Sequence, residues 1–371
     1  MKKILFISSN KVWGGSEELW FRSAKIALER GLFVGVYTFK DMLPQSKIEE
    51  LQQYQKIIFF YRKKYNILKR IYNRLVPSKW QIHNDFNKNA LKWQPDIVLF
   101  SHGNNFATEE AISLFRNKNI KYCTVGQAAT EYWWPQNKDV FNIRENFNNS
   151  EANYFVSQAN LKLTELQIGC KILNSKVIRN PFNVPYDAKL DYPDSSVLKL
   201  ACVARYHFES KGQDILLEVL NQQKWRDRNI EVNLYGSGEN EEGIKNLINY
   251  LGLTNVFVKG FTKTIDIWKE NHALILPSRY EGLPLAIVEA MLCGRFAITT
   301  NVSGNGEVII DGENGFIAEV PRMEYLNKAM ERAWNKKDKW EEIGNKAKHY
   351  IKTLIPESPE TVFLDELLSK I

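Results

Sequence analysis

The stretch "ALILPSRYEGLPLAIVEAMLCGRFAITT", residues 273–300, holds a strand, a loop, a helix and a second strand in succession. Its apolar runs "ALILP" and "FAITT" have the length of buried strands, and "LAIVEAML" between them predicts a helix that ends before Gly294. A helix that joins two buried strands is typical of the crossover between parallel strands of one sheet. The stretch therefore predicts an α/β fold.

The same alternation of short apolar runs and helical patterns continues through the rest of the chain. The strand-like runs before residue 180 are "ILFI", "FVGVYT", "KIIFF", "DIVLF", "YCTV", "NYFV" and "KVIR". Those after residue 197 are "LKLACVA", "VNLY", "VFVKG", "ALILP", "FAITT" and "GFIAEV". We therefore expect two Rossmann-like, doubly wound domains that face each other across a cleft, with a shared ligand beyond the carboxyl ends of their strands.

Prolines and turn residues mark the boundary between the two series, in "NPFNVPYDAKLDYPDSSV". The expected organisation is an N-terminal domain over 1–182, a linker over 183–197, a C-terminal domain over 198–355 and a last amphipathic helix over 356–371. Packing of this last helix against the N-terminal domain is one of two alternatives. The first crossover helix is expected over 16–31, with Ser16 as its N-cap.

Composition excludes several classes of protein. The chain has 371 residues and a formal charge of +7, which suits an anionic ligand or an anionic membrane face but is too small to indicate nucleic acid. No apolar stretch approaches the roughly 20 residues of a membrane span. The cysteines lack the spacing of a metal site or a disulfide framework, so we expect a cytoplasmic protein; they are Cys123, Cys170, Cys202 and Cys293.

The loop after "LKLACVA" carries two cations, Arg205 and Lys211, just before a helix expected to begin near Gln213. Arginine offers a fixed fork of donors, lysine a mobile point charge, and a helix start a set of backbone N–H groups. Together these groups suit a diphosphate. The alternative for this loop is a pair of solvated surface cations.

Two glutamates flank the apolar run at the centre of residues 273–300. Glu281 lies in the loop after a strand, and Glu289 lies within the next helix. A glutamate among apolar helical residues is costly to bury without partners, and the vicinal hydroxyls of a ribose would satisfy its acceptor oxygens. A glutamate on the solvent face of the helix is the alternative.

Glycines in two loops would let a ligand approach the backbone closely. Gly14 and Gly15 follow the first strand, and Gly236 follows "VNLY". For Gly236 a tight turn is the alternative, because Glu241 breaks the dinucleotide-binding pattern GxGxxG.

Aromatic and basic side chains in the first half suggest contacts with an acceptor. Trp133, with Tyr132 and Trp134 beside it, predicts a platform for a sugar ring or, alternatively, packing between the domains. The basic amphipathic segment "YRKKYNILKRIYNRLVPSKW", residues 61–80, predicts peripheral contact with an anionic membrane. A solvated helix that packs its apolar face on the sheet is the alternative for that segment.

These motifs resemble those of the GT-B glycosyltransferases, in particular the retaining family four, also called glycosyl transferases group 1. The resemblance covers essentially the whole chain. It rests on the E-x7-E element in "EGLPLAIVE", its context "PSRYEGLPLAIVEAMLCG", the arginine–lysine element in "ARYHFESKGQD", and "IRNPFNV", "NVSGNGEVIIDGENGFIAE" and "GGSE".

The resemblance implies a retaining, metal-independent transfer without cofactor. A sugar would move from a nucleotide diphosphate sugar, a UDP-sugar in preference to a GDP-sugar, to a glycan or lipid-linked glycan in polysaccharide biosynthesis. Arg205 and Lys211 would neutralise the diphosphate, Glu281 would contact the transferred sugar, and Glu289 would hold the ribose hydroxyls. Gly282 and Leu283 would line the same donor site.

The chain departs from that family at one position. Where the family commonly places a histidine near the donor sugar, this chain has Gln127 in "VGQAAT". Glutamine can hydrogen-bond a sugar hydroxyl but cannot titrate, which puts a general-base role there in doubt. His102 is the second candidate for this position.

Other functions remain as alternatives. A glycoside hydrolase also uses two carboxylates, but it leaves Arg205 and Lys211 without a role. A sugar-nucleotide epimerase on the same fold would need no acceptor, and a non-catalytic nucleotide-sugar-binding protein would need no catalytic group at Gln127. A nicotinamide dehydrogenase is disfavoured because the GxGxxG pattern is absent from the sequence.

Overall fold

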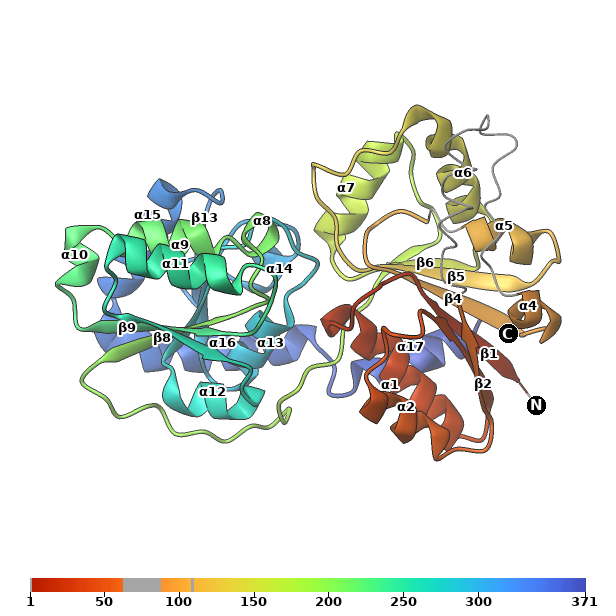
Figure 1. The fold of residues 1–371 in the computed structure, drawn as a ribbon, viewed down its shortest axis with the longest axis horizontal. Helices are drawn as coiled ribbons and strands as arrows, with labels where there is room; N and C mark the ends of the chain where they lie inside the picture. The colour runs from red at the N-terminus through yellow and green to blue at the C-terminus, as the bar shows by residue number, and fades with distance from the viewer. Residues whose placement is uncertain (1, 63–87, 108–109) are drawn as a thin grey trace. The chain divides into compact units, whose positions relative to one another are not determined.

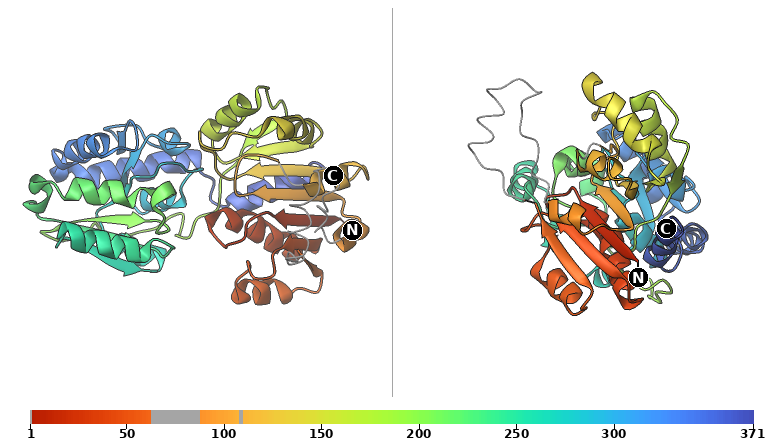
Figure 2. Two further views of the ribbon diagram at one scale, coloured as in Figure 1. Left: turned by 45° about the horizontal axis from the view of Figure 1, so that its top comes forward. Right: turned by 90° about the vertical axis from the view of Figure 1, so that its right-hand side faces the viewer.

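The computed structural model describes residues 2–62, 88–107 and 110–371, which form two compact units (Figure 1). The first unit comprises Met1–Val156, Asn160–Pro181 and Ser358–Ile371, and the second comprises Ser157–Ala159 and Phe182–Glu357. Each unit contains one sheet of parallel strands with helices on both faces, as the further views in Figure 2 also show. The predicted fold class is confirmed.

The sheet of the first unit has the strand order β3-β2-β1-β4-β5-β6-β7. All of its neighbouring strands are parallel, and His102 at the end of β4 lies opposite Gly126 at the end of β5. Every strand expected in this half is present: β1 Lys3–Ser8, β2 Phe33–Thr38, β3 Ile57–Tyr61, β4 Ile97–His102, β5 Lys121–Gly126, β6 Ala152–Phe155 and β7 Ser175–Val177.

Helices cover both faces of this first sheet (Figure 1). They are α1 Gly15–Glu29, α2 Gln45–Gln52, α4 Lys88–Lys92, α5 Glu110–Arg116, α6 Asn137–Asn148, α7 Gln158–Ile168 and α17 Pro359–Leu368. The last of these, α17, packs against α1 and buries Phe363, Leu364 and Leu367 in the core that α1 shares. The C-terminal helix is therefore part of the first unit.

Helix α1 does not begin as its sequence predicts. Its N-cap is Gly14, and the hydroxyl of Ser16 donates to the Glu17 carboxylate instead of capping the helix. Glu17 is fully buried and also accepts hydrogen bonds from Ser8 Oγ at 2.6 Å and Trp20 Nε1 at 2.7 Å. Burial raises the pKa of Glu17. Glu17 therefore links the first turn of α1 to Ser8 at the end of β1. The sequence showed an acidic first turn but not this link.

The sheet of the second unit has the order β10-β9-β8-β11-β12-β13, so β8 and β11 are central neighbours. Its neighbouring strands are also parallel. The strands expected in this half are present as β8 Leu198–Val203, β9 Ile230–Tyr235, β10 Val256–Gly260, β11 Ala273–Leu276, β12 Phe296–Thr300 and β13 Gly315–Ala318.

The helices of the second unit include one that is apolar on almost every side. Helix α13, the helix of the stretch 273–300, packs against α16 and has all but one of its residues buried, which explains its apolar sequence. The helices are α8 Phe208–Lys211, α9 Gln213–Leu220, α10 Gln223–Arg226, α11 Glu241–Leu251, α12 Thr264–Glu270, α13 Leu285–Leu292, α14 Asn305–Val308, α15 Met323–Trp334 and α16 Trp340–Leu354. Within the described ranges, no helix combines the length and the apolar character that crossing a membrane requires.

The stretch predicted as a linker packs on the second unit, where Phe182, Val184 and Ala188 enter the hydrophobic core. Arg295, directly before β12, contacts a later part of the same stretch. This buried guanidinium donates to the carbonyl of Asp191 at 2.7 Å and lies 5.1 Å from the centre of the Tyr192 ring. The segment is thus attached to the second unit by apolar burial and by a cation.

The imidazole of His272, which precedes β11, makes the second unit sensitive to acid. It is buried, its Nδ1 accepts the backbone N–H of Lys199 at 2.9 Å, and burial together with the charge of Arg295 lowers its pKa. The folded state therefore favours the neutral ring. Its stabilising contribution is complete above the unfolded pKa of about 6.5 and is lost as pH falls through the lower folded pKa.

We expect the free energy of unfolding to fall between pH 7.5 and pH 5, and to fall less in the variant His272→Gln. Urea unfolding of both proteins at the two pH values measures this difference. Equal acid sensitivity of the variant and the natural chain would show that other groups cause the loss.

Candidate functional site

Two loops at the carboxyl ends of β8 and β11 meet because these strands are neighbours. Lys211 ends α8 in the first loop, and Glu281 lies in the second. Lys211 Nζ is 2.6 Å from Glu281 Oε1, and Ser278 Oγ donates to the same oxygen at 2.7 Å. The lysine and glutamate side chains are only 17% and 8% exposed. The structure thus brings two predicted site residues into direct contact.

Arg205 lies on the same loop as Lys211 but is exposed. No hydrogen bond or ion pair of its guanidinium is found within the part of the chain that the structure describes. Its carbonyl accepts a hydrogen bond from Gln213 Nε2 at 2.7 Å, and α9 begins at Gln213 as predicted. Arg205 is therefore available to an anion that approaches this loop from solvent.

A further ion pair, which the sequence did not reveal, holds the two loops together. Arg279 contacts both carboxylate oxygens of Asp214 at 2.8 and 2.6 Å, and its backbone N–H donates to the Ser210 carbonyl at 2.8 Å. Ser210 and Asp214 flank Lys211 in the sequence, and Arg279 lies two residues before Glu281. Both charges are visible in the sequence, but their pairing requires knowledge that β8 and β11 are adjacent.

Glu289 is the fifth residue of α13 and is 4% exposed, so it does not lie on a solvent face of the helix. Its Oε1 accepts hydrogen bonds from the backbone N–H and from Nδ2 of Asn183, both at 2.9 Å. Asn183 comes from the stretch predicted as a linker and lies in the quoted segment "IRNPFNV", where no single residue was predicted to act in the site. Nearer Glu281, Gly282 and Leu283 are buried, and the Gly282 carbonyl accepts the N–H of Gly304 at 2.9 Å.

The predicted glycines differ in what surrounds them. Gly236 has a φ of +143°, and a Cβ atom there would lie 2.1 Å from the carbonyl oxygen of Ala204. The close approach that Gly236 permits is therefore to the chain's own backbone, in the loop after β8. A Cβ atom at Gly14 would meet nothing within 4 Å, and Gly15 is exposed, so the loop after β1 borders open space.

In the first unit, His102 ends β4 and Gln127 directly follows the adjacent strand β5. Gln127 is buried, its backbone N–H donates to the His102 carbonyl at 3.1 Å, and its Oε1 accepts from Asn180 Nδ2 at 2.7 Å. Among described residues, Gln127 Nε2 and Asn180 Oδ1 are buried without a hydrogen-bond partner. Exchanging N and O in both amides still leaves one donor and one acceptor unpaired. Sequence analysis missed Asn180.

The aromatic residues after β5 divide between packing and exposure. Trp133 is partly buried against the core of the first unit, and its carbonyl accepts Gln167 Nε2 at 3.1 Å. Tyr132 and Trp134 on either side are 79% and 58% exposed. Trp133 therefore packs within the first unit, while its two neighbours present rings to solvent from an anchored loop.

Most of the basic segment 61–80 lies outside the described residues, namely 63–80. Of its cations, Arg62 is described. Its guanidinium lies 5.2 Å from the centre of the Tyr37 ring and 5.0 Å from that of Phe39. This one cation packs on the first unit.

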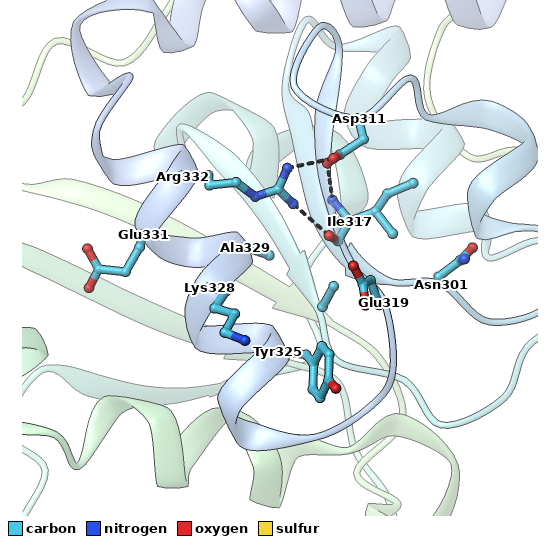
Figure 3. Close-up of a pocket in the computed structure, with 10 residues that line it drawn as sticks. Asn301, Asp311, Ile317, Glu319, Tyr325, Lys328, Ala329, Glu331 and Arg332 are labelled. Carbon is cyan, nitrogen blue, oxygen red and sulfur yellow. Dashed lines mark hydrogen bonds and ion pairs between the residues drawn. The ribbon is translucent and has the colours of Figure 1, made fainter.

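A hollow of about 710 Å³ lies beside β13 and α15, and none of the predicted site residues lines it (Figure 3). Figure 3 shows the Arg332 guanidinium pointing toward Asp311 and the Ile317 carbonyl, and the latter contact measures 2.7 Å. Asp311 in turn accepts the N–H of Ile317 at 2.8 Å. These side chains satisfy backbone groups on the outer edge of β13, which protects the sheet from pairing with another strand.

The family described as glycosyl transferases group 1 matches residues 194–350, the part of the chain that carries the Lys211–Glu281 contact. This match covers most of the second unit. The matched residues include Arg205, Lys211, Glu281 and Glu289, which lie on loops and a helix at the carboxyl side of the second sheet.

Known proteins similar to this chain agree with the family. An uncharacterised glycosyltransferase of Methanocaldococcus jannaschii is 29% identical over 145 residues, 38% of this chain and 40% of the relative. The poly(ribitol-phosphate) alpha-N-acetylglucosaminyltransferase of Staphylococcus aureus is 28% identical over 193 residues, 48% of this chain and 39% of the relative. The chain therefore spans about two fifths of the length of these curated relatives.

Solved structures resemble the chain over its whole length. Anabaena HepE in complex with UDP has a TM-score of 0.77 and 19% identity, with all of both chains covered. At this identity the likeness shows the fold, which is the GT-B architecture of two Rossmann-like domains.

Proposed function

We propose that this chain is a retaining glycosyltransferase that moves a sugar from a UDP-sugar to a glycan or lipid-linked glycan acceptor in polysaccharide biosynthesis. The observation that carries the proposal is the contact between Lys211 and Glu281, within a group 1 glycosyltransferase domain. The UDP bound to HepE and the polymer named for the S. aureus relative support the choice of donor and acceptor.

Lys211 and Arg205 would bind the diphosphate of the donor. Lys211 supplies a partly buried point charge, and Arg205 supplies an exposed fork of donors on the same loop. As the bond between the anomeric carbon and the diphosphate breaks, negative charge grows on the departing oxygen. Cations placed beside that oxygen stabilise its growing charge, so a metal ion is not part of the proposal.

The carboxylates would orient the donor. Glu289 is buried and oriented by Asn183, so its carboxylate is placed to accept hydrogen bonds from ribose hydroxyls. Glu281 would accept a hydrogen bond from a hydroxyl of the transferred sugar. The acceptor hydroxyl would attack on the face that the diphosphate leaves, and its proton would pass to the departing diphosphate. Positioning then supplies most of the catalytic effect.

The first unit would contribute uncharged sugar contacts. The unpaired donor of Gln127 and acceptor of Asn180 match the acceptor and donor of one hydroxyl group. Because neither amide titrates near neutral pH, this pair would hold a sugar without acting as a base. The exposed rings of Tyr132 and Trp134 offer faces on which an acceptor sugar ring could stack.

Calorimetric titration with UDP and GDP tests the donor site. We expect the natural chain to bind UDP, and Lys211→Ala and Glu289→Ala each to weaken binding by about 10-fold or more, since each removes a charged hydrogen-bonding group. Lys328→Ala, which removes an exposed cation outside these loops, serves as the matched control and should bind UDP as the natural chain does. Absence of binding to both nucleotides would overturn the proposal.

A further inference from the structure

Lys211 and Glu281, which have separate roles in the proposed site, form an ion pair with each other. Lys211 Nζ and Glu281 Oε1 are 2.6 Å apart, and both side chains are mostly buried. The same Glu281 oxygen also accepts Ser278 Oγ at 2.7 Å. Lys211 is therefore already engaged, and an anion that enters the site competes with a carboxylate for it.

The contact is held by the fold. Arg279, two residues before Glu281, joins the two loops through its ion pair with Asp214 and the hydrogen bond from its N–H to the Ser210 carbonyl. The backbone N–H of Glu281 also donates a hydrogen bond to the Ser303 hydroxyl oxygen at 3.2 Å. Loops fixed in this way place the ammonium and the carboxylate together without help from a ligand.

The electrostatic consequence follows from burial. A partly buried ammonium is stabilised by a neighbouring carboxylate that balances its charge. An incoming diphosphate must first displace that carboxylate, which reduces the free energy of its own binding. The negative charge of Glu281 also repels the diphosphate. Both effects lower the affinity of the empty site for a nucleotide.

We propose that Glu281 acts as an internal competitor of the nucleotide: it holds Lys211 in the empty site and releases it to the donor diphosphate. Release leaves the Glu281 carboxylate without its cation and ready to accept a hydroxyl of the donor sugar. Glu281 thus lowers the affinity for the nucleotide and provides a contact with the sugar of the donor. This inference rests on the proposed function, because it takes a nucleoside diphosphate as the ligand.

The variant Glu281→Gln tests the competition, because glutamine has the shape of glutamate and keeps an acceptor for Ser278 but lacks the charge. We expect its dissociation constant for UDP to fall about 10-fold relative to the natural chain, a typical size for coupling between two bound groups. Its melting temperature without ligand should be lower, since Lys211 loses its counter-charge, and UDP should raise that temperature more than in the natural chain. Glu313→Gln, which removes an exposed charge elsewhere on the unit, should change neither quantity.

A second variant is expected to change UDP affinity in the opposite direction. Ser278→Ala removes one of the two side-chain donors to Glu281 Oε1, so the carboxylate should hold Lys211 more firmly and UDP should bind more weakly. If the natural chain binds UDP and Glu281→Gln binds it equally or less well, the competition is absent. If neither the natural chain nor Glu281→Gln binds UDP or GDP, the donor site itself is wrong, an outcome that the titration distinguishes from the first.

Discussion

Arg295→Ala is expected to lower the free energy of unfolding by about 3–5 kcal/mol. Arg295 is 2% exposed, and its guanidinium donates to the carbonyls of Trp268 at 3.1 Å, Asn271 at 3.0 Å and Asp191 at 2.7 Å. Its removal takes this donor from the buried carbonyls of Trp268 and Asn271 and from the partly buried carbonyl of Asp191, and it opens a cavity beside Tyr192. Urea unfolding followed by circular dichroism measures the loss.

The variant Arg295→Met separates the hydrogen bonds from the volume. Methionine fills much of the space of the arginine but donates nothing, so we expect a loss smaller than that of Arg295→Ala and clearly above zero. Burial lowers the pKa of Arg295, which shows that its charge is held at some cost. If Arg295→Met is as stable as the natural chain, the three carbonyls do not depend on the guanidinium, and the attachment of the linker must rest on apolar burial alone.

Gly212→Ala is expected to cost about 2–5 kcal/mol of unfolding free energy and to weaken UDP binding at least 10-fold. Gly212 separates α8 from α9 with a φ of +64°, and a Cβ atom there would lie 2.1 Å from the Pro277 carbonyl oxygen. Because the conflict is with backbone, either the segment that carries Lys211 or the loop that carries Glu281 must move. Unfolding and UDP titration of the same preparation measure both effects.

Gly252→Ala is the matched control for this prediction. Gly252 has a nearly equal φ of +60°, but a Cβ atom there would meet nothing within 4 Å. Its substitution should cost about 1 kcal/mol, the strain of the left-handed backbone alone, and leave UDP binding unchanged. Similar losses for Gly212→Ala and Gly252→Ala would mean that the close packing of the two loops contributes nothing to the site.

The strands and the loops that carry the site could be predicted from the sequence because their signals are local. Buried parallel strands appear as short apolar runs, and polar residues that follow such runs lie at the carboxyl edge of a sheet whatever the order of the strands. Lys211 and Glu281 could therefore be placed at that edge before the structure was known. Burial of Glu289 was also foreseeable, since its helix is apolar on nearly every side.

The sequence did not show which of these residues meet. Lys211 and Glu281 are 70 positions apart, and their contact depends on β8 lying beside β11. The same holds for Asn180 with Gln127, 53 positions apart, for Asn183 with Glu289, and for the guanidinium of Arg295 with the linker. Pairings of this kind follow from strand order and from how buried polar groups find partners, which are properties of the packed chain. The sequence alone thus determined the kind of fold and the loops on which chemistry could occur. The tertiary structure decided that the proposed phosphate-binding lysine is held by the proposed sugar-binding glutamate, because only packing brings distant charges into one buried contact.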